Sequence, residues 1–279
     1  MEQTGNLTPA DNVSPLAALE LAGVSLSLGG KTVLSGISFR VEKGETLMLL
    51  GEAASGKSVL LKLVLGLLRA DSGRILVDGE DIARLAESEL APYRRRMGMV
   101  FQEGALFDSL SVFENVAYRL REDGQTDEDA IERRVREVLG FVEMEQAIDK
   151  MPSELSGGMK RRVSIARAIV SDPSIMLYDS PTAGLDPVTA NTINELLAKL
   201  RDVGHVSSIV VTHRLQDAFI LASGVYSAEE NRIISANNHG SQLRPSTRFM
   251  VLREGAAYFL GAERELTASA DPYLRRFLA

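Results

Sequence analysis

The sequence predicts an α/β fold with a mainly parallel sheet, to which an antiparallel β subdomain and an inserted α-helical subdomain are attached. Apolar strand-like segments alternate with helical segments from "ETLMLL" near residue 45 to "SSIVVTH" near residue 207, and such alternation is typical of a parallel sheet covered by helices. The first strand-like segments instead alternate apolar and polar residues between glycine turns, which favours antiparallel pairing. A charged, helical stretch from about residue 85 to 148 interrupts the alternation.

The antiparallel strands are expected near the start of the chain. Residues 1–16 are polar and are expected to be a flexible leader. The segments "LELAGVSLSLGG" and "TVLSGISFRVEKG" then break at Gly29-Gly30 and at Gly44, which predicts strand, turn and strand. A further short strand is expected at "GRILVDG", from Gly73 to Gly79.

The parallel sheet is expected from apolar runs with helices between them. Glu45 to Leu50 form a mostly continuous apolar run, as in a strand buried on both faces, and a helix is predicted from Ser58 to Leu68. A helix from Gly157, the strand "SIMLYD", a helix through "TANTINELLAKLRD" and the strand "SSIVVTH" continue the pattern. The strands "RFMVLREG" and "AAYFLG" and a short amphipathic tail come last.

These elements predict a division of the chain into parts. The segment near residues 224–247 is rich in Ser and Asn and is expected to be a polar surface excursion, either a tolerated loop or a contact with a partner. The expected parts are a leader (1–16), an α/β core (17–92 and 165–223), a helical subdomain (93–164), the excursion (224–247) and the C-terminal strands and tail (248–279).

The composition limits the classes of function. Of the 279 residues, 45% are hydrophobic and 25% are charged, as in soluble globular proteins. The formal net charge of −7 argues against a dedicated nucleic-acid binder, which usually carries an excess of basic residues. The chain has no cysteine, so it forms no disulfide. No run of 18 apolar residues occurs, so no transmembrane helix is expected and any work at a membrane requires another chain.

The segment G-E-A-A-S-G-K-S, Gly51 to Ser58, matches the phosphate-loop pattern. Its glycines let backbone N–H groups converge on phosphate oxygens, and the following helix presents its positive end. Lys57 is expected to contact the β- and γ-phosphates, and the Ser58 hydroxyl to bind Mg²⁺. The alternative is an ordinary glycine-rich turn, but a buried strand before it and a helix after it favour nucleotide binding. The residues expected to bind nucleotide here are Gly51, Glu52, Ala53, Ala54, Ser55, Gly56, Lys57, Ser58 and Val59.

A second site is expected at the end of the strand "SIMLYD". Asp179 is placed there, and an acidic residue at the tip of a central strand beside a phosphate loop is where P-loop enzymes hold Mg²⁺. The alternative is a helix N-cap, a position that Asp favours.

A third motif is "LSGGMKRRVSIARAI", from Leu155 to Ile169. Ser156 can cap a helix that opens with Gly157 and Gly158, and such a helix end attracts anions. Glycines at a helix start cost up to about 1 kcal/mol each relative to alanine, and close approach to a phosphate offers compensation. The basic run Lys160 to Arg162 is interpreted as a solvated helix face.

Together these motifs carry a resemblance. A phosphate loop, then "LSGG", "YD", "AGLDP" and "TH" in this order resembles the ATP-binding cassette (ABC) family over nearly the whole chain from about residue 18. The resemblance implies a RecA-like P-loop NTPase core. It also implies that two cassettes pair head to tail, with ATP between the phosphate loop of one and the signature residues Ser156, Gly157, Gly158 and Met159 of the other.

Further roles follow from the resemblance alone. Gln102 corresponds to the Q-loop glutamine, which contacts both Mg²⁺ and the coupling helix of a membrane partner. Asp186 corresponds to the D-loop, which links the two sites, and His213 to the switch histidine at the γ-phosphate. Leu28 takes the place of the usual aromatic residue under the adenine. His205 and His239 lack such a context and are expected at the surface.

The chain departs from the family pattern at Ser180. ABC cassettes usually have a glutamate directly after the Asp179 position, where it polarises the attacking water, whereas this chain has serine. A serine hydroxyl cannot act as a carboxylate base, and loss of general-base help typically costs about 10²–10⁴ in rate. We therefore expect the chain to bind Mg-ATP and to hydrolyse it slowly, with His213 or another carboxylate as a partial substitute.

Finer resemblance concerns "GKSVLLK", the segment from Gln102 ("FQEGALFDSLSVFENVAYRLRE"), Met159 in the signature, and the ending "SADPYLRRFL". These are similar to the ATPases of Mla/Mce-type phospholipid transport systems. This implies an integral-membrane permease and an MCE-type lipid-binding protein as partners, a homodimeric cassette pair, and a location on the inner face of the bacterial cytoplasmic membrane. The alternatives are a soluble, non-transport ABC ATPase of the cluster-assembly type and a regulatory cassette.

Overall fold

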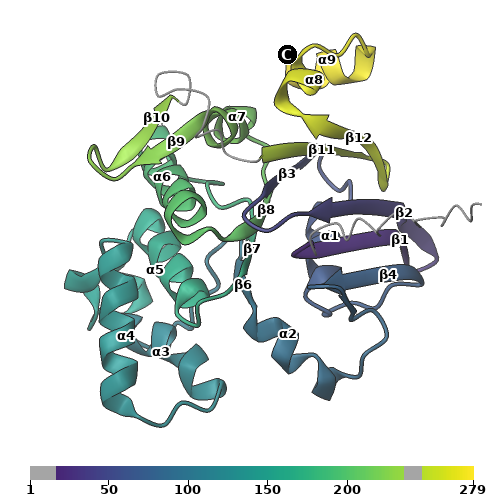
Figure 1. The fold of residues 1–279 in the computed structure, drawn as a ribbon. Coiled ribbons are helices and arrows are strands. Elements are labelled where there is room, and N and C mark those ends of the chain that lie inside the picture. The colour runs from purple at the N-terminus through teal and green to yellow at the C-terminus, as the bar shows by residue number, and fades with distance from the viewer. Residues whose placement is uncertain (1–16, 236–246) are drawn as a thin grey trace, which may run out of the picture.

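The computed structural model describes residues 17–235 and 247–279, and its centre is a six-stranded sheet (Figure 1). Strands β11, β3, β8, β7 and β6 run parallel to one another, and β12 pairs antiparallel with β11 at the edge. This confirms the mainly parallel sheet. In sheet order the strands are β12 (Ala256–Ala262), β11 (Thr247–Arg253), β3 (Thr46–Gly51), β8 (Ser207–Val211), β7 (Ile175–Asp179) and β6 (Met97–Val100).

The two faces of this sheet belong to two separate hydrophobic cores. Because side chains alternate along a strand, Met48 and Leu50 of β3 join the core under α3 to α7, whereas Leu47 and Leu49 join the core with α1. Every residue of β3 is buried, which confirms the prediction for this segment. The covering helices are α1 (Lys57–Val64), α3 (Val112–Glu122), α4 (Glu128–Phe141), α5 (Gly157–Ile169), α6 (Pro187–Gly204) and α7 (Leu215–Ser223).

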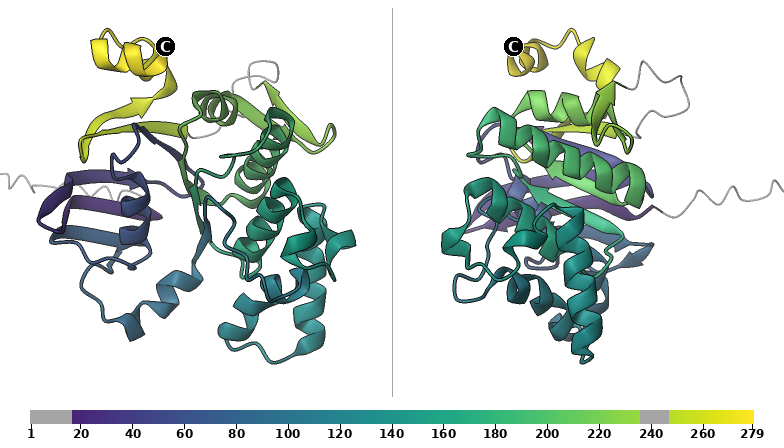
Figure 2. Two further views of the ribbon diagram at one scale, coloured as in Figure 1. Left: turned by 180° about the vertical axis from the view of Figure 1, so that it is seen from behind. Right: turned by 90° about the vertical axis from the view of Figure 1, so that its left-hand side faces the viewer.

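A second, antiparallel sheet packs on the α1 side, as Figure 2 shows from behind. It has the order β2-β1-β4-β5, and the β1–β2 hairpin turns at Gly29-Gly30 as predicted. Its strands are β1 (Leu19–Leu28), β2 (Lys31–Val41), β4 (Ser72–Val77) and β5 (Glu80–Asp81).

The remaining elements are short. They are η1 (Glu87–Glu89), α2 (Ala91–Arg95), η2 (Glu145–Ala147), η3 (Pro152–Glu154), β9 (Gly224–Ser227), β10 (Arg232–Ser235), α8 (Glu263–Thr267) and α9 (Pro272–Leu278). Helices α8 and α9 lie beyond β12 at the end of the chain (Figure 1). In the part of the chain that the structure describes, no helix combines the length and the apolar character needed to cross a bilayer.

Three secondary-structure predictions were wrong in detail. The segment 97–100, placed in the helical subdomain, forms β6 and pairs with β7, because four residues are too few to show a strand period between charged helical turns. The helix after the phosphate loop ends at Val64. Residues 224–235 of the expected excursion form the hairpin β9–β10. The expected leader at 1–16 and residues 236–246 lie outside the described residues, and the part boundaries stay predictions.

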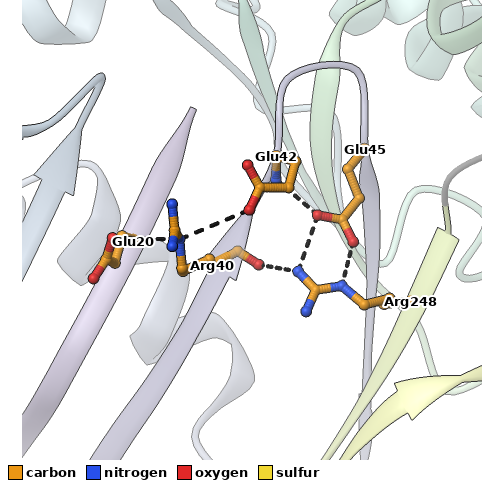
Figure 3. A network of polar contacts seen from close by, with 5 residues as sticks. All are labelled: Glu20, Arg40, Glu42, Glu45 and Arg248. Carbon is orange, nitrogen blue, oxygen red and sulfur yellow. Dashed lines mark hydrogen bonds and ion pairs between the residues drawn. The ribbon is translucent and has the colours of Figure 1, made fainter. Parts of the chain in front are cut away.

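Ionic contacts join the antiparallel sheet to the strand that carries the phosphate loop (Figure 3). Arg248 of β11 donates to the carboxylate of Glu45, which is 2% exposed, and to the backbone carbonyl of Arg40 in β2. The Glu45 carboxylate also accepts from the Glu42 N–H at 2.7 Å. Arg40 pairs with Glu20 and Glu42 at 3.5 and 3.7 Å. Strands β1, β2 and β11 are thereby linked at the start of β3.

Candidate nucleotide-binding site

The phosphate loop connects the C-terminal end of β3 to α1. At two of its positions only glycine fits, because a Cβ atom would clash with neighbouring atoms. A Cβ atom on Gly51 would lie 2.4 Å from the carbonyl oxygen of Leu252, and one on Gly56 would lie 2.7 Å from Leu34 Cδ2. Gly56 also adopts a left-handed φ of 101°, which disfavours other residues. The glycine pattern is therefore explained by the fold of this chain and not by ligand contact alone.

The loop is folded around the ammonium group of Lys57, which is buried. Its Nζ donates to the carbonyl oxygens of Gly51 and Glu52 at 2.9 and 2.7 Å and to Ser55 Oγ at 3.2 Å. Burial lowers the pKa of Lys57, and the negative charge of Asp179 opposes this shift. A cation thus lies at the centre of the loop with Asp179 nearby, which is the charge arrangement for a polyphosphate with a divalent cation.

The N-terminus of α1 leaves its first backbone N–H groups without a capping side chain. Gly56 is the N-cap, makes no side-chain hydrogen bond, and no acidic residue occurs in the first turn. Ser58 is exposed in this turn and Val59 is half-buried. These N–H groups and the positive end of the helix can bind an anion.

Asp179, Ser180 and His213 lie together at the C-terminal ends of the adjacent strands β7 and β8. Ser180 is 2% exposed and has a left-handed φ of 51°. Its hydroxyl lies 3.4 Å from Asp179 Oδ1 and 3.3 Å from His213 Nε2. A hydroxyl has one proton, so Ser180 donates either to Asp179 or to Nε2 of His213, according to the tautomer of the histidine. The sequence did not predict this contact.

The signature residues lie on a different part of the chain. Ser156 Oγ caps α5 by accepting from the Met159 N–H at 3.3 Å, as predicted. A Cβ on Gly158 would lie 2.4 Å from Thr189 Cγ2, so this glycine permits close contact between the starts of α5 and α6. Within the described residues, no hydrogen bond joins Ser156–Met159 to the phosphate loop.

Asp186 is the N-cap of α6. Its carboxylate accepts from the N–H groups of Val188 and Thr189, both at 3.0 Å, and from Thr189 Oγ1 at 2.5 Å. The Thr189 side-chain bond, together with the backbone bonds, lowers the pKa of Asp186. The capping role that was weighed for Asp179 belongs in this structure to Asp186.

Gln102 is exposed, and its backbone is fixed by α5. The carbonyl oxygens of Phe101 and Gln102 accept from the guanidinium group of Arg161, which is 5% exposed. The prediction of a solvated face was wrong for Arg161. The missed signal is that Arg161 shares the helical period with Ile165 and Ala168, both buried.

A groove of about 360 Å³ lies beside this loop, which we call the Q-loop groove. Phe101, Phe107 and Tyr118 line it and are 37%, 43% and 42% exposed. The rings of Phe107 and Tyr118 are 4.9 Å apart, and Arg167 lies 5.6 Å from the centre of the Phe107 ring. The groove therefore presents apolar and aromatic surface with two cationic side chains, Arg119 and Arg167.

The remaining predicted residues are peripheral. Leu28 ends β1 and is 42% exposed, so its expected contact with adenine stays a prediction. His205 is exposed, as expected, and His239 lies outside the described residues. The hydroxyl of Ser58, the carboxylate of Asp179 and the side-chain amide of Gln102 provide oxygen donors, which suit Mg²⁺.

Comparisons with known proteins agree with this geometry. The family model described as ABC transporter matches residues 34–183. The intermembrane phospholipid transport system ATP-binding protein MlaF of Haemophilus influenzae is 37% identical over 235 residues, covering 84% of this chain and 89% of the relative. MlaF of Escherichia coli K12 is 35% identical over 243 residues, covering 86% and 89%. A dimeric ATP-binding cassette, MJ0796, bound to ADP and Pi superposes with a TM-score of 0.72 at 27% identity, covering 88% and 98%.

Proposed function

The chain belongs to the ABC transporter family, whose model matches more than half of it, and on this basis we propose that it is the ATP-binding subunit of a phospholipid transport system. It is an ATPase whose hydrolysis is coupled to transport through a separate membrane permease. The similarity to two bacterial phospholipid transport ATPases over most of both chains supports this substrate class.

The observation that carries the proposal is the loop folded around Lys57. Its ammonium group, held at 2.7–3.2 Å by three oxygens of the loop, lies next to the uncapped start of α1. In the proposed roles Lys57 binds the β- and γ-phosphates and the first N–H groups of α1 bind phosphate oxygens. Ser58, Asp179 and Gln102 would hold Mg²⁺, which neutralises charge on the phosphates.

The signature residues act, in this proposal, on the nucleotide of a second cassette. The capped, glycine-rich start of α5 is not bonded to the phosphate loop of its own chain within the described residues. The similarity to a dimeric cassette supports a head-to-tail pair, in which Ser156–Met159 of one copy face the phosphates held by the other. We propose that this pair is a homodimer.

Ser180 sets the expected rate of hydrolysis. Its hydroxyl lies between Asp179 and His213, so it can orient the histidine but cannot accept a proton as a carboxylate does. We propose that His213 polarises the attacking water in part and that turnover is slow. A regulatory role in a larger assembly is the second candidate, and Ser180 is the observation that favours it.

The Q-loop groove is the proposed docking site for a coupling helix of the permease. One of its three exposed aromatic residues, Phe101, directly precedes Gln102 in the chain, so a helix bound there can transmit the state of the nucleotide site. An MCE-type lipid-binding protein completes the proposed system, and the chain is placed at the inner face of the bacterial cytoplasmic membrane. No nucleic acid is expected as a partner.

Co-expression with candidate membrane subunits tests this function. The wild-type chain is expected to co-purify with a polytopic membrane protein in detergent, and Phe107→Ser is expected to lose it. Leu67→Ser is the matched control, because Leu67 is 52% exposed but lies outside the groove. Stable partners that are all soluble would instead support the non-transport, cluster-assembly class.

A further inference from the structure

The C-terminal arm, which we define as β12, α8 and α9 (residues 256–279), lies next to the phosphate loop. The register of the sheet brings it there, because Leu252 of β11 pairs with Gly51 at the end of β3. The next residues along the two parallel strands, Arg253 and Glu52, therefore occupy matching positions. Arg253 in turn lies 4.3 Å from the centre of the Tyr273 ring in α9. Helix α9 therefore packs on Arg253, the residue that directly follows the strand partner of Gly51.

Tyr273 is fixed in place by the arm around it. Its ring packs against Tyr258 of β12 at 5.0 Å and against Phe277 of α9 at 6.1 Å. Asp271 caps α9 by accepting from the Tyr273 N–H at 2.9 Å, and Tyr258 donates to the same Asp271 at 2.8 Å. The ring therefore has little freedom to turn, and the direction of its hydroxyl is set by the arm.

Tyr273 is 7% exposed, and its buried hydroxyl makes no hydrogen bond of 3.5 Å or less within the described residues. Burial raises the pKa of this phenol, and the nearby Glu52 carboxylate raises it further. A buried donor without an acceptor is unfavourable. The acidic group that raises its pKa, Glu52, belongs to the phosphate loop.

We propose that Tyr273 is a positioning residue for the phosphate loop, whose hydroxyl donates a hydrogen bond to the Glu52 carboxylate as the loop closes on a polyphosphate. The proposal rests on the nucleotide site described above. Lys57 Nζ holds the backbone carbonyl of Glu52 at 2.7 Å, so a phosphate that attracts Lys57 also moves Glu52. The new bond satisfies the buried hydroxyl and keeps the Glu52 charge away from the anionic phosphates.

The experiment measures ATP affinity of the full-length chain by calorimetry. Tyr273→Phe is expected to weaken ATP binding about tenfold, the loss of one hydrogen bond to a charged group. The single-turnover rate at saturating ATP should stay unchanged, because Tyr273 does not contact Asp179, Ser180 or His213. The thermal midpoint should be equal or higher, because a buried, unpartnered hydroxyl is removed. A residue with a purely structural role would lower stability and affinity together.

Two further variants separate the hydroxyl contact from a general effect of the arm. Tyr258→Phe removes a hydroxyl from the same arm and is expected to leave ATP affinity within twofold of wild type. In a Glu52→Ala background, Tyr273→Phe should also change affinity by less than twofold, since the acceptor is gone.

The proposal is overturned if Tyr273→Phe binds ATP as wild type does, if Tyr258→Phe weakens binding equally, or if the tenfold loss persists without Glu52. Absence of ATP binding by the wild-type chain would instead overturn the nucleotide site itself.

Discussion

The N-termini of α1 and α5 differ in how their first backbone N–H groups are used. At α1, the N-cap is Gly56 in a left-handed conformation, and no side chain accepts from the first turn. At α5, Ser156 caps the helix and accepts from the Met159 N–H. Both helices lack acidic residues in the first turn, whereas α3 and α4 carry them there.

The difference indicates that the α1 region forms a complete phosphate-binding site within one chain, whereas the α5 region requires a phosphate held by a second chain. The α1 region gathers a lysine and uncapped N–H groups from the helix that follows β3, and a carboxylate from the end of β7. The α5 region is stabilised on its own, by the Ser156 cap and by the contact of Gly158 with Thr189. In the proposed dimer the α1 region of one copy holds the phosphates. The α5 region of the other copy contacts them in the conformation that it already has in the single chain.

The largest expected effect is on hydrolysis in the α1 region. Ser180→Glu restores a carboxylate beside Asp179 and His213, and single-turnover hydrolysis should rise by about 10²–10⁴. Ser180→Ala is the control and should give no rise. Equal rates for Ser180→Glu and wild type would show that another group already acts as the base.

Removing the central cation of the loop tests whether the α1 region alone holds ATP. Lys57→Ala should weaken ATP binding about 100-fold, since a charged hydrogen-bond donor to phosphate is lost. Lys62→Ala, on the exposed side of the same helix, should bind as wild type. If Lys57→Ala bound ATP in calorimetry as tightly as wild type, the α1 region would not be the site that holds the phosphates.

Much of the α1 region could be predicted, because the residues that form it are neighbours in the sequence. The loop from Gly51 to Ser58 carries its chemistry in eight adjacent residues, between a strand and a helix with clear patterns. The contact of Ser180 with His213 could not be predicted, because it depends on the lateral pairing of β7 and β8. The helical period indicates that Arg161 is buried, but its partners could not be predicted, because they are backbone carbonyls about 60 residues earlier, which carry no sequence signature.

Replacing Arg161 tests whether the α5 region is stabilised independently of the nucleotide site. Arg161→Met leaves the carbonyls of Phe101 and Gln102 without their donor, and the free energy of unfolding should fall by about 2 kcal/mol. ATP affinity measured without Mg²⁺ should stay within twofold, because Arg161 acts on Gln102, a proposed Mg²⁺ ligand, and no contact joins it to the phosphate loop within the described residues. Lys160→Met, a half-buried neighbour, is the control in denaturant unfolding. A parallel loss of ATP affinity would mean that the two regions are coupled within one chain.

The smallest expected effect concerns the close contact between α5 and α6. Gly158→Ala places a Cβ against Thr189 Cγ2, and this should cost about 1 kcal/mol after the better helix propensity of alanine is included. Thr189→Ser removes the clashing methyl group and keeps the hydroxyl that bonds Asp186. In that background Gly158→Ala should be neutral or stabilising by thermal unfolding. A loss of the same size in both backgrounds would assign the requirement for glycine to another cause.

The position of β3 has a consequence for the order of events during synthesis. Both neighbours of this strand in the sheet, β8 and β11, are encoded far downstream of it. In a nascent polypeptide, one edge of β3 therefore stays unpaired until β8 has been made, and the other stays unpaired until β11 has been made. Premature termination before β11 yields a fragment in which one edge of the fully buried strand β3 is open to aggregation, so protection of this edge depends on residues Thr247–Arg253.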